Sequence, residues 1–535
     1  MRLERLLKRL NNDVHLVIPQ SLGAQPNNLS LRGVKRRSNP DEIASLTSFA
    51  RNDMPLITNA LHRLGDYPLG LDIKSISANS KTVKKGALFV AVEGTKSRGS
   101  DFIAEALRNG ALCVAGSRLN TGVNFKHVPF IKVRDSRRAL AVLADEFFDH
   151  PSKKLKVVGV TGTNGKTTIT YLIRDILKRA DFSSGVIGTI NYCYQDKVIP
   201  SSHTTPGPIE LQSLLNNMAK SACHYCVMEV SSHGLDQERT MGIDFEAAIF
   251  TNLTPDHLDY HKTLENYFLA KSKLFGALKA EAHAIVNLDS PYAPRLRNLS
   301  RGKFVGYAID SPADFKARDL SLSLEGSEFV LEAQGIKSRI KTRLAGRHNI
   351  LNILAAIAFG VTQKIELSQI QKAVENFKGV RGRLGRVKAN ARNVFIDYAH
   401  TPDALQNVLS ILRQFTKGRL FVVFGCGGER DRLKRPLMGG VVEKYADVII
   451  ITSDNPRAEE PLRIAKEIVA GIKTKEYKII LDRREAIKRA LAKANSLDTV
   501  LIAGKGHENY QIFKDKKIEF DDQIVVEEYI REKGL

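Results

Sequence analysis

Residues 157–168 read VVGVTGTNGKTT, and the interpretation of the whole chain starts from this stretch. A short apolar run ends in a turn that contains Gly162 and Gly165, and a helix-periodic segment, ITYLIRDILKRA, follows directly. Strand, glycine turn and helix are the context of a phosphate-binding loop. The glycines let several backbone N–H groups point at one anion, and the start of the helix adds the positive end of its dipole.

The side chains of this loop suit a nucleoside triphosphate. We expect Lys166 to reach the outer phosphates and the hydroxyl of Thr167 to hold a Mg²⁺ ion. The spacing is tighter than the common G-x-x-x-x-G-K-[ST] pattern, because only Thr163 and Asn164 separate the two glycines. A Gly-Lys-Thr string can arise by chance, but its place between a strand and a helix favours ATP binding.

Length and charge restrict the function classes. A chain of 535 residues is too long for one hydrophobic core and predicts three or four domains. Lys and Arg exceed Asp and Glu by 81 − 58 = 23. The basic residues are scattered, mixed with acids and not interleaved with aromatics, so small polyanionic substrates are favoured over nucleic acid. No stretch approaches the roughly 20 apolar residues of a membrane span.

The cysteines indicate a reducing compartment. Five cysteines without framework spacing do not predict disulfides. Cys223 and Cys226 could form half of a zinc or redox site, but an apolar run follows them and there is no second pair, so a buried thiol pair is favoured. The N-terminus lacks the apolar segment of a secretory signal. A transit peptide is an alternative, and the cytoplasm is the expected location.

Composition and periodicity divide the chain into four parts. Residues 1–65 have no clear period and are interpreted as an extension, partly helical, whose role does not follow from the sequence. Residues 66–151 predict a small α/β domain, and 152–379 predict the phosphate-loop domain. A basic, glycine-rich link leads into 380–535, a Rossmann-like domain without the dinucleotide fingerprint. Strands that alternate with helices predict parallel sheets.

Polar residues follow the apolar runs of the central part. Glu229 ends one such run, and an acid at a strand tip near a phosphate loop is a usual partner of Mg²⁺. The string NLTPDHLDYH, which contains His257, ends the next run and favours metal or substrate binding. Lys271 and Lys273 lie on an amphipathic helix, whose pattern alone predicts that both face solvent. Asn349 could read a purine edge, although a helix cap is the commoner role.

The C-terminal part repeats this arrangement. Four polar or glycine-rich clusters each follow an apolar run, at residues 397–400, 425–428, 454–457 and 504–508. Because the carboxyl ends of parallel strands meet at one edge of a sheet, we expect these clusters to line one crevice.

Taken together, the motifs resemble those of the Mur ligase family. The supporting strings run in order from about Leu71 to the C-terminus: TGTNGKTT, HTTPGP, MEVSSHGLDQER, FTNLTPDHLDYH, AKSKLF, AGRHNILN, IDYAHTPDAL, FGCGGERDRLKRPLMG, DNPRAEEP and AGKGHENYQ. The resemblance implies an α/β protein of three domains: a small N-terminal UDP-sugar-binding domain, a central phosphate-loop ATPase domain and a C-terminal Rossmann-like domain that binds the amino acid.

The resemblance also implies a reaction. The family member that this chain resembles most adds meso-diaminopimelate to UDP-N-acetylmuramoyl-L-alanyl-D-glutamate, a cytoplasmic step of peptidoglycan and cell-wall synthesis. ATP would phosphorylate the D-glutamyl carboxylate, and the incoming amino group would attack the acyl phosphate. Positioning and charge neutralisation dominate such a reaction, so Mg²⁺ and cationic side chains should matter more than a strong base. The implied protein acts as a monomer, without nucleic acid or a membrane.

Site residues follow from the matched positions. Catalytic roles are implied for Lys166, Glu229, His257 and Lys271. The implied ATP-binding residues are Gly162, Thr163, Asn164, Gly165, Lys166, Thr167, Thr168, Asn349, Arg383 and Asp397. Metal ligation is implied for Thr167, Glu229, His257 and a carbamylated Lys271. The implied UDP-sugar residues are Ser80, Thr95, Lys96, Ser97, His203, Thr204, Thr205, Ser231, Gln237 and Arg239. The implied diaminopimelate residues are Arg430, Asp454, Asn455, Pro456, Arg457, Gly504 and Glu508.

The choice of amino acid depends on two arginines. Diaminopimelate differs from lysine by one distal carboxylate, which Arg457 and Arg430 could clamp, while Glu508 suits the distal ammonium. Two alternatives remain. One is a sister ligase that adds lysine or a dipeptide, or a folylpolyglutamate-type enzyme. The other is a non-enzymatic Mur-like scaffold, suggested by the N-terminal extension and the net charge of +23.

Overall fold

The computed structural model describes residues 1–8, 10, 14–17, 70–94, 97–119, 128–389, 392–514 and 516–533. Contacts group them into two compact units. The first comprises Met1–Pro151, Gly207–Asn216 and Gln237–Ile243. The second comprises Ser152–Pro206, Asn217–Asp236 and Asp244–Leu535.

The first unit contains a small α/β sheet in the strand order β1-β5-β4-β3-β2. Strands β2 to β5 pair in parallel, and β1 is antiparallel to β5. The elements are β1 (Val14–Val17), β2 (Ser75–Ser77), β3 (Ala87–Ala91), β4 (Ala111–Gly116), β5 (Phe130–Val133), α1 (Leu3–Lys8), α3 (Ile103–Arg108) and α4 (Ser136–Phe147). Leu3, Leu6 and Leu10 are buried in the same core as Leu88 and Ile131. The start of the predicted extension is therefore part of this domain.

The central domain is built on a sheet of eleven described strands, ordered β16-β15-β14-β13-β12-β11-β6-β10-β7-β8-β9. Its middle strands are parallel, and the hairpins at both edges are antiparallel. The strands are β6 (Lys156–Thr161), β7 (Ser184–Ile187), β8 (Asn191–Tyr194), β9 (Lys197–Pro200), β10 (Tyr225–Glu229), β11 (Phe245–Phe250), β12 (His283–Asn287), β13 (Lys303–Ala308), β14 (Phe315–Leu322), β15 (Ser327–Ala333) and β16 (Ile336–Thr342).

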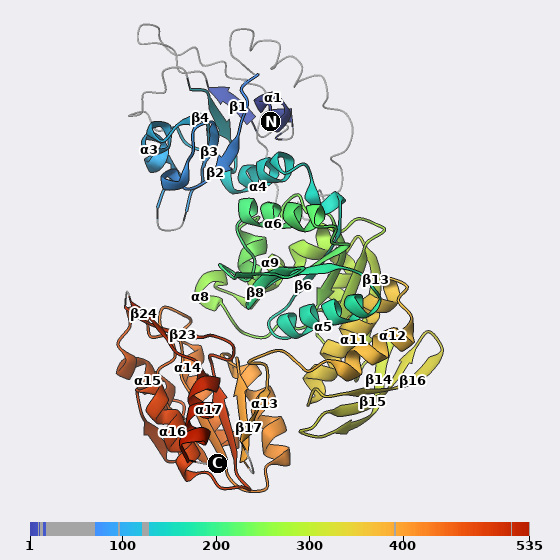
Figure 1. Ribbon diagram of the computed structural model, residues 1–535, viewed down its shortest axis with the longest axis vertical. Helices are drawn as coiled ribbons and strands as arrows, with labels where there is room; N and C mark the ends of the chain where they lie inside the picture. Colours follow the sequence, from blue (N-terminus) through green and yellow to red (C-terminus); the bar gives the residue numbers. More distant parts are fainter. Residues whose placement is uncertain are drawn as a thin grey trace, which may run out of the picture. The chain divides into compact units, whose positions relative to one another are not determined.

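Three helices of this domain pack together on one face of the sheet: α5 (Lys166–Arg179), α11 (Arg347–Thr362) and α12 (Leu367–Asn376) (Figure 1). Their apolar stripes form a continuous core with β6, β10 and β11. Helix α11 is apolar almost all round, as expected for a fully buried helix. The remaining helices are α6 (Pro208–Lys220), α7 (Ser232–Asp236), α8 (Leu258–His261), α9 (Leu264–Gly276) and α10 (Ala293–Leu299).

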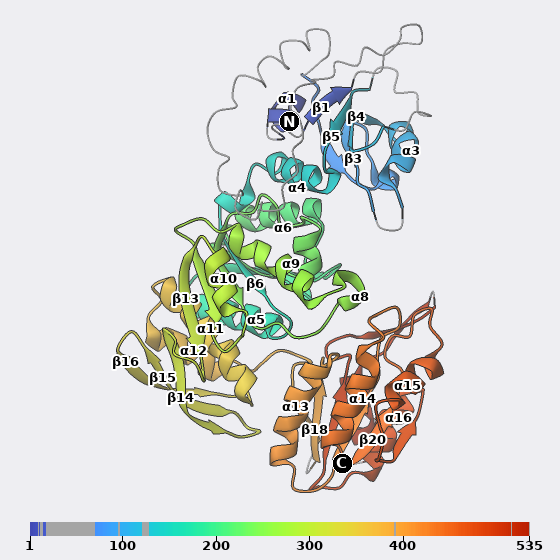
Figure 2. The same ribbon diagram turned by 180° about the vertical axis from the view of Figure 1, so that it is seen from behind.

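The C-terminal domain contains a six-stranded sheet in the order β17-β18-β22-β19-β20-β21, parallel except for β17. Its strands are β17 (Gly385–Ala389), β18 (Arg392–Asp397), β19 (Leu420–Phe424), β20 (Val448–Ile451), β21 (Tyr477–Ile479) and β22 (Thr499–Ala503), and the hairpin of β23 (Tyr510–Phe513) and β24 (Lys516–Glu519) follows. Each sheet face has its own apolar core. Helices α13 (Pro402–Phe415), α14 (Lys434–Tyr445) and α15 (Pro461–Val469) cover one face, and α16 (Arg483–Lys493) and α17 (Asp522–Lys533) the other (Figure 2).

None of the described helices is both long and apolar enough to cross a membrane. All five cysteines are free and buried, including Cys223 and Cys226. Burial raises the pKa of the Cys226 thiol, which keeps it protonated.

Candidate active site

The phosphate loop lies between the end of β6 and the start of α5. Gly162 and Gly165 have φ angles of 141° and 91°, in the region that favours glycine. A Cβ on Gly162 would lie 1.8 Å from Thr251 Oγ1, and one on Gly165 would lie 2.3 Å from Asn352 Oδ1. Both positions therefore require glycine for conformation and for space.

The residues after β11 hold the loop in place. Thr251 Oγ1 donates to the carbonyl oxygen of Asn164 at 2.6 Å. The Asn164 backbone N–H donates to Asn252 Oδ1 at 2.9 Å, and Thr163 N–H donates to the Asn252 carbonyl at 2.9 Å. These bonds fix the loop from the neighbouring strand, so its shape does not depend on a bound anion.

Lys166 begins α5 and bends back over the loop. Its ammonium donates to the carbonyl oxygens of Gly162 at 3.0 Å and Thr163 at 2.8 Å. Burial lowers its pKa, and the nearby Glu229 carboxylate opposes that shift. The ammonium therefore lies against the backbone of the glycine loop.

Glu229 and Thr167 meet at the end of β10. Thr167 Oγ1 donates to Glu229 Oε1 at 3.1 Å, and Glu229 is only 1% exposed. Thr189 also binds this carboxylate, through its N–H at 2.9 Å and its hydroxyl at 3.0 Å. Arg383 Nη2 donates to Thr167 Oγ1 at 2.9 Å. A hydroxyl and a carboxylate side by side are the oxygen donors that Mg²⁺ prefers.

Lys271 is buried, at 1% exposure, so the expectation that it faces solvent is wrong. Its Nζ donates to the carbonyl oxygen of Gly162 at 2.8 Å and lies 4.5 Å from the centre of the Tyr267 ring. Burial, and then the charge of Lys166, lower the pKa of Lys271 well below its usual range. The side chain of Lys273 on the same helix is 45% exposed. Helix periodicity placed both lysines on a polar face, whereas the phosphate loop covers one of them.

His257 lies at the start of α8 with a left-handed φ of 55°. Its Nε2 is 3.4 Å from Asp256 Oδ2, and burial lowers its pKa while Asp256 opposes the shift. Among the described residues, no group of three or more His, Cys, Asp and Glu side chains is arranged to hold a metal ion. The donors at this edge are instead the Thr167–Glu229 pair, with Lys271 as an amine. They fit Mg²⁺ on condition that Lys271 gains an oxygen-bearing group.

The residues predicted to contact adenine and ribose are bonded within the protein. Asn349 Nδ2 donates to the Ala345 carbonyl at 2.9 Å, and its Oδ1 accepts from Asn352 at 3.1 Å. Asp397 ends β18 and accepts N–H groups of Leu384 and of Ala399, the latter at 2.7 Å. Burial raises the pKa of Asp397 to about 6.

The C-terminal clusters meet at one edge of their sheet, as predicted for the ends of parallel strands. Asn455 Nδ2 donates to Glu508 Oε2 at 2.8 Å, and the fully buried Lys505 donates to the same oxygen at 3.0 Å. Gly504 has a φ of 112°, and a Cβ there would lie 2.7 Å from Asp454 Oδ2. Asn455 and Lys505, which follow two different strands, thus orient the Glu508 carboxylate.

Arg457 and Arg430 flank Gly427 at the same edge. A Cβ on Gly427 would lie 3.2 Å from Arg457 Nη1 and 3.5 Å from Arg430 Cγ. Arg457 has a left-handed φ of 52°, and its Nη1 donates to the Gly428 carbonyl at 2.8 Å. The Arg457 guanidinium and the stem of the Arg430 side chain thus lie beside the same glycine turn.

Three domain families match the chain. The Mur ligase family catalytic domain matches residues 72–148, the Mur ligase middle domain 160–360, and the Mur ligase glutamate ligase domain 382–506. A UDP-N-acetylmuramoyl-L-alanyl-D-glutamate--2,6-diaminopimelate ligase of Clostridium acetobutylicum is 43% identical over 87% of this chain and 96% of its own length. This chain belongs to the Mur ligase family.

Other relatives agree with this assignment. A ligase of the same name from Aquifex aeolicus is 45% identical over 86% of this chain and 94% of its own length. A solved structure of such a ligase is 35% identical, with a TM-score of 0.62 over 86% of this chain and 95% of that one. The solved MurF ligase from Thermotoga maritima in complex with ADP shares the fold, at 22% identity and a TM-score of 0.60. The family and three-domain α/β architecture predicted from the sequence are thus confirmed.

In this Mur ligase the predicted UDP-sugar residues are divided between the two compact units. Ser80, Ser97, Gln237 and Arg239 lie in the first; Ser80 Oγ donates to Glu105 at 2.5 Å, and Arg239 binds Gln237 at 2.8 Å. His203, Thr204, Thr205 and Ser231 lie in the second, where Thr205 Oγ1 donates to the Glu229 carbonyl at 2.9 Å. Thr95 and Lys96 lie outside the described residues. Roles in UDP-sugar binding stay predictions.

Sequence reasoning missed several residues of the Mur ligase site. The hydroxyl of Thr189 lies between two oxygens: it is 3.0 Å from Glu229 Oε2 and 3.0 Å from Thr204 Oγ1. Lys505 lies in the string GKGHE, directly after the apolar run TVLIA. A charged residue at the end of such a run is a signal that the sequence contains. Arg435 is completely buried in α14, on the helix face that also carries Met438, Gly439 and Val442, although its charge is typical of an exposed residue.

Proposed function

We propose that this Mur ligase adds meso-diaminopimelate to the D-glutamyl carboxylate of UDP-N-acetylmuramoyl-L-alanyl-D-glutamate, with conversion of ATP to ADP and phosphate. The observation that carries the amino-acid choice is the pair of arginines at Gly427, which lies at the same strand edge as the oriented Glu508 carboxylate. The names of the relatives support the same substrate. The proposal also places the protein in the cytoplasm, as a monomer that acts on small anionic substrates.

The nucleotide end is proposed to work by positioning. Backbone N–H groups of residues 165–168, at the start of α5, and the ammonium of Lys166 would hold the phosphates in line with the substrate carboxylate. Asn349, Arg383 and Asp397 are proposed to hold the adenosine. Because Asn349 and Asp397 are bonded internally, they would need to exchange a protein partner for the nucleotide.

Thr167, Glu229, His257 and a carbamylated Lys271 are proposed to hold Mg²⁺. Bound Mg²⁺ would neutralise the charge that develops on the transferring phosphoryl group. The neutral amine favoured by burial is the form of Lys271 that can react with carbon dioxide. Carbamylation would convert it into the oxygen donor that this edge lacks.

The chemistry then has two steps. A D-glutamyl carboxylate oxygen attacks the γ-phosphorus of ATP, the bond to the β-phosphate oxygen breaks, and an acyl phosphate forms. The amino group of diaminopimelate attacks the acyl carbon, loses a proton, and phosphate leaves from the tetrahedral intermediate. Lys166 lies where it can stabilise the negative charge in both steps.

At the other end, the two distal groups of diaminopimelate have proposed partners. Arg430 and Arg457 would clamp the distal carboxylate, and Glu508 would accept the distal ammonium. Lysine lacks that carboxylate and would leave Arg430 and Arg457 without the group that they are proposed to bind.

The deciding experiment measures phosphate release from Mg-ATP and UDP-N-acetylmuramoyl-L-alanyl-D-glutamate, with meso-diaminopimelate or L-lysine in parallel. We expect release with diaminopimelate only. Release with lysine would keep the ligase reaction and refute the amino-acid choice. If neither amino acid causes phosphate release, in protein that binds ATP, a non-enzymatic scaffold is favoured.

Arg457→Ala tests the arginine clamp. We expect kcat/KM for diaminopimelate to fall about 100-fold while the Kd for ATP stays within a factor of two, because the change removes one side of a bidentate site. Steady-state kinetics and nucleotide titration measure both. An equal loss of ATP binding would make Arg457 a structural residue.

A further inference from the structure

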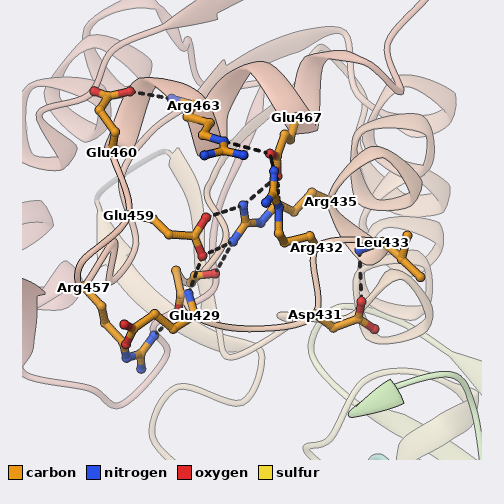
Figure 3. A network of polar contacts seen from close by, with 12 residues as sticks. Glu429, Asp431, Arg432, Leu433, Arg435, Arg457, Glu459, Glu460, Arg463 and Glu467 are labelled. Carbon is orange, nitrogen blue, oxygen red and sulfur yellow. Dashed lines mark hydrogen bonds and ion pairs between the residues drawn. The ribbon is translucent and has the colours of Figure 1, made fainter. Parts of the chain in front are cut away.

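Arg435, in the first turn of α14, is a buried charge that the proposed reaction does not use. Its side chain is 0% exposed. Its Nη1 donates to Glu459 Oε2 at 2.9 Å and to Glu467 Oε2 at 2.6 Å (Figure 3). Its Nη2 donates to Glu459 Oε1 at 3.0 Å and to the carbonyl oxygen of Gly427 at 3.1 Å. One guanidinium thus joins two carboxylates from a neighbouring segment to the turn that follows β19.

The turn at residues 427–429 is held at each of its three residues. Arg435 binds the carbonyl of Gly427, and Arg457 Nη1 binds the carbonyl of Gly428 at 2.8 Å. The backbone N–H of Glu429 donates to Glu459 Oε1. A Cβ on Gly428 would lie 1.9 Å from the Pro456 carbonyl oxygen, so the turn packs directly on the segment that carries Arg457.

This arrangement connects Arg435 to both arginines of the proposed clamp. Arg430 follows the turn by one residue, so the direction of the turn sets where its side chain starts. Arg457 is bonded to the turn itself. Glu459 follows Arg457 by two residues and is the carboxylate that Arg435 grips with both of its terminal nitrogens. Arg435 therefore contacts the supports of both clamp residues.

Stability alone is a weak reason for such a buried charge. Desolvation of ions is costly, and apolar groups of similar volume often replace buried ion pairs without loss of stability. Only a planar guanidinium can bond two carboxylates and a carbonyl at once in a fixed fork. The bonds to Arg435 lower the pKa of Glu459 to about 2, so the carboxylate stays ionised at physiological pH.

We propose that Arg435 is a positioning residue, which holds the turn at residues 427–429 so that Arg430 and Arg457 match the distal carboxylate of diaminopimelate. This role rests on the proposed function. It differs from a general structural role because its effect passes through the clamp. Loosening the turn should weaken use of diaminopimelate and leave ATP binding unchanged.

Two conservative variants separate these roles. Arg435→Lys keeps the buried charge but has one terminal nitrogen, which cannot bond Glu459, Glu467 and Gly427 together. Glu459→Gln keeps the shape of the side chain and removes its charge. The matched control is Arg432→Gln. Arg432 pairs with the same Glu467, but its side chain is 49% exposed, and among the described residues it bonds only to that carboxylate.

The experiment measures KM for diaminopimelate, KM for ATP and kcat by phosphate release in wild type, the two variants and the control. We expect Arg435→Lys and Glu459→Gln to raise KM for diaminopimelate by about 10- to 100-fold with KM for ATP unchanged, as for loss of a supporting contact. Arg432→Gln should stay within about two-fold of wild type.

A double-mutant cycle with Arg457→Ala completes the test. If Arg435 acts through the clamp, Arg435→Lys should have little further effect on KM for diaminopimelate once Arg457 is absent. Fully additive losses, parallel losses for ATP and diaminopimelate, or a wild-type KM in both variants would overturn the proposal. If Arg435→Lys fails to fold, Glu459→Gln carries the same test. Failure of the proposed function itself would appear in the wild-type enzyme, as no activity with diaminopimelate.

Discussion

The amine of Lys271 lies in a buried site between the Gly162 carbonyl and the ring of Tyr267. A charged ammonium at 1% exposure, with the cation of Lys166 nearby, is unfavourable, so its pKa is lowered. The same surroundings favour the neutral amine form of the side chain. Its chemistry is therefore decided by neighbours that lie about a hundred residues away in the sequence.

Replacement of Lys271 should nearly abolish turnover. We expect Lys271→Ala and Lys271→Arg to lower kcat by about 1,000-fold, since neither side chain can carry a carbamate that supplies an oxygen donor to Mg²⁺. Phosphate release measures the loss, and added bicarbonate should not restore it. Lys273→Ala, on the same helix and half-exposed, is the control that should keep activity. Normal turnover in Lys271→Ala would refute the carbamylation proposal.

Asp397 should make stability depend on pH. Burial raises its pKa in the folded protein from 3.8 to about 6, so the folded state holds a proton that the unfolded state has released. Between about pH 4 and pH 6 the contribution of Asp397 to stability therefore falls as the pH rises, by about 3 kcal/mol. Relative to wild type, Asp397→Asn should gain stability through this window and level off above it.

Calorimetry is the suitable measurement for Asp397, because the chain has no tryptophan to report unfolding. The difference in transition temperature between Asp397→Asn and wild type cancels the other carboxylates. A difference that does not change with pH would mean that Asp397 titrates normally in the folded protein.

The shape of the loop between β6 and α5 depends on residues from other elements that pack against it. Its glycines allow the backbone conformation, but Thr251 and Asn352, from two other elements, fill the space where side chains would be. The loop therefore packs directly against the residues after β11 and against the start of α11.

Gly162→Ala should remove nucleotide binding. The new Cβ would lie 1.8 Å from Thr251 Oγ1 at a φ of 141°, so the turn must shift and its N–H groups lose their common direction. We expect the Kd for ATP to rise at least about 100-fold in a titration, as a small displacement of a positioned anion site can cost that much. In Gly276→Ala, at the end of α9, the nearest atom to the Cβ is 3.9 Å away. That variant should bind ATP normally, and a similar loss in both would contradict the argument.

The net charge of +23 is a property of the whole molecule, and the proposed substrates are all anionic or carry carboxylates. A positive field raises the encounter rate of anions, and salt screens it over a distance of about 10 Å at 0.1 M. We expect kcat/KM for the UDP-linked substrate to fall several-fold between about 10 mM and 300 mM KCl, with kcat unchanged. A neutral osmolyte at equal osmolality is the control. If kcat/KM does not change with KCl concentration, the positive charge does not attract this substrate.

The family, the order of the domains' motifs and the identity of most candidate residues could be predicted from the amino-acid sequence. Glycines at positions 162 and 165, the Gly-Lys-Thr string and the polar clusters after apolar runs report local chemistry, and local chemistry can be read from neighbouring residues. The prediction that the C-terminal clusters share one edge also followed, because parallel strands end on the same side.

Burial and the pairing of side chains from distant segments became visible in the folded structure alone. Helix periodicity could not show that Lys271 points at the phosphate loop, because the Gly162 carbonyl that receives it is 109 residues away. Arg435 and Lys505 lie in basic or glycine-rich strings, and only packing shows that both are 0% exposed and joined to carboxylates. A buried charge is costly unless a partner offsets it, and both its burial and its partner depend on which surfaces meet in space. A local sequence pattern does not contain this information.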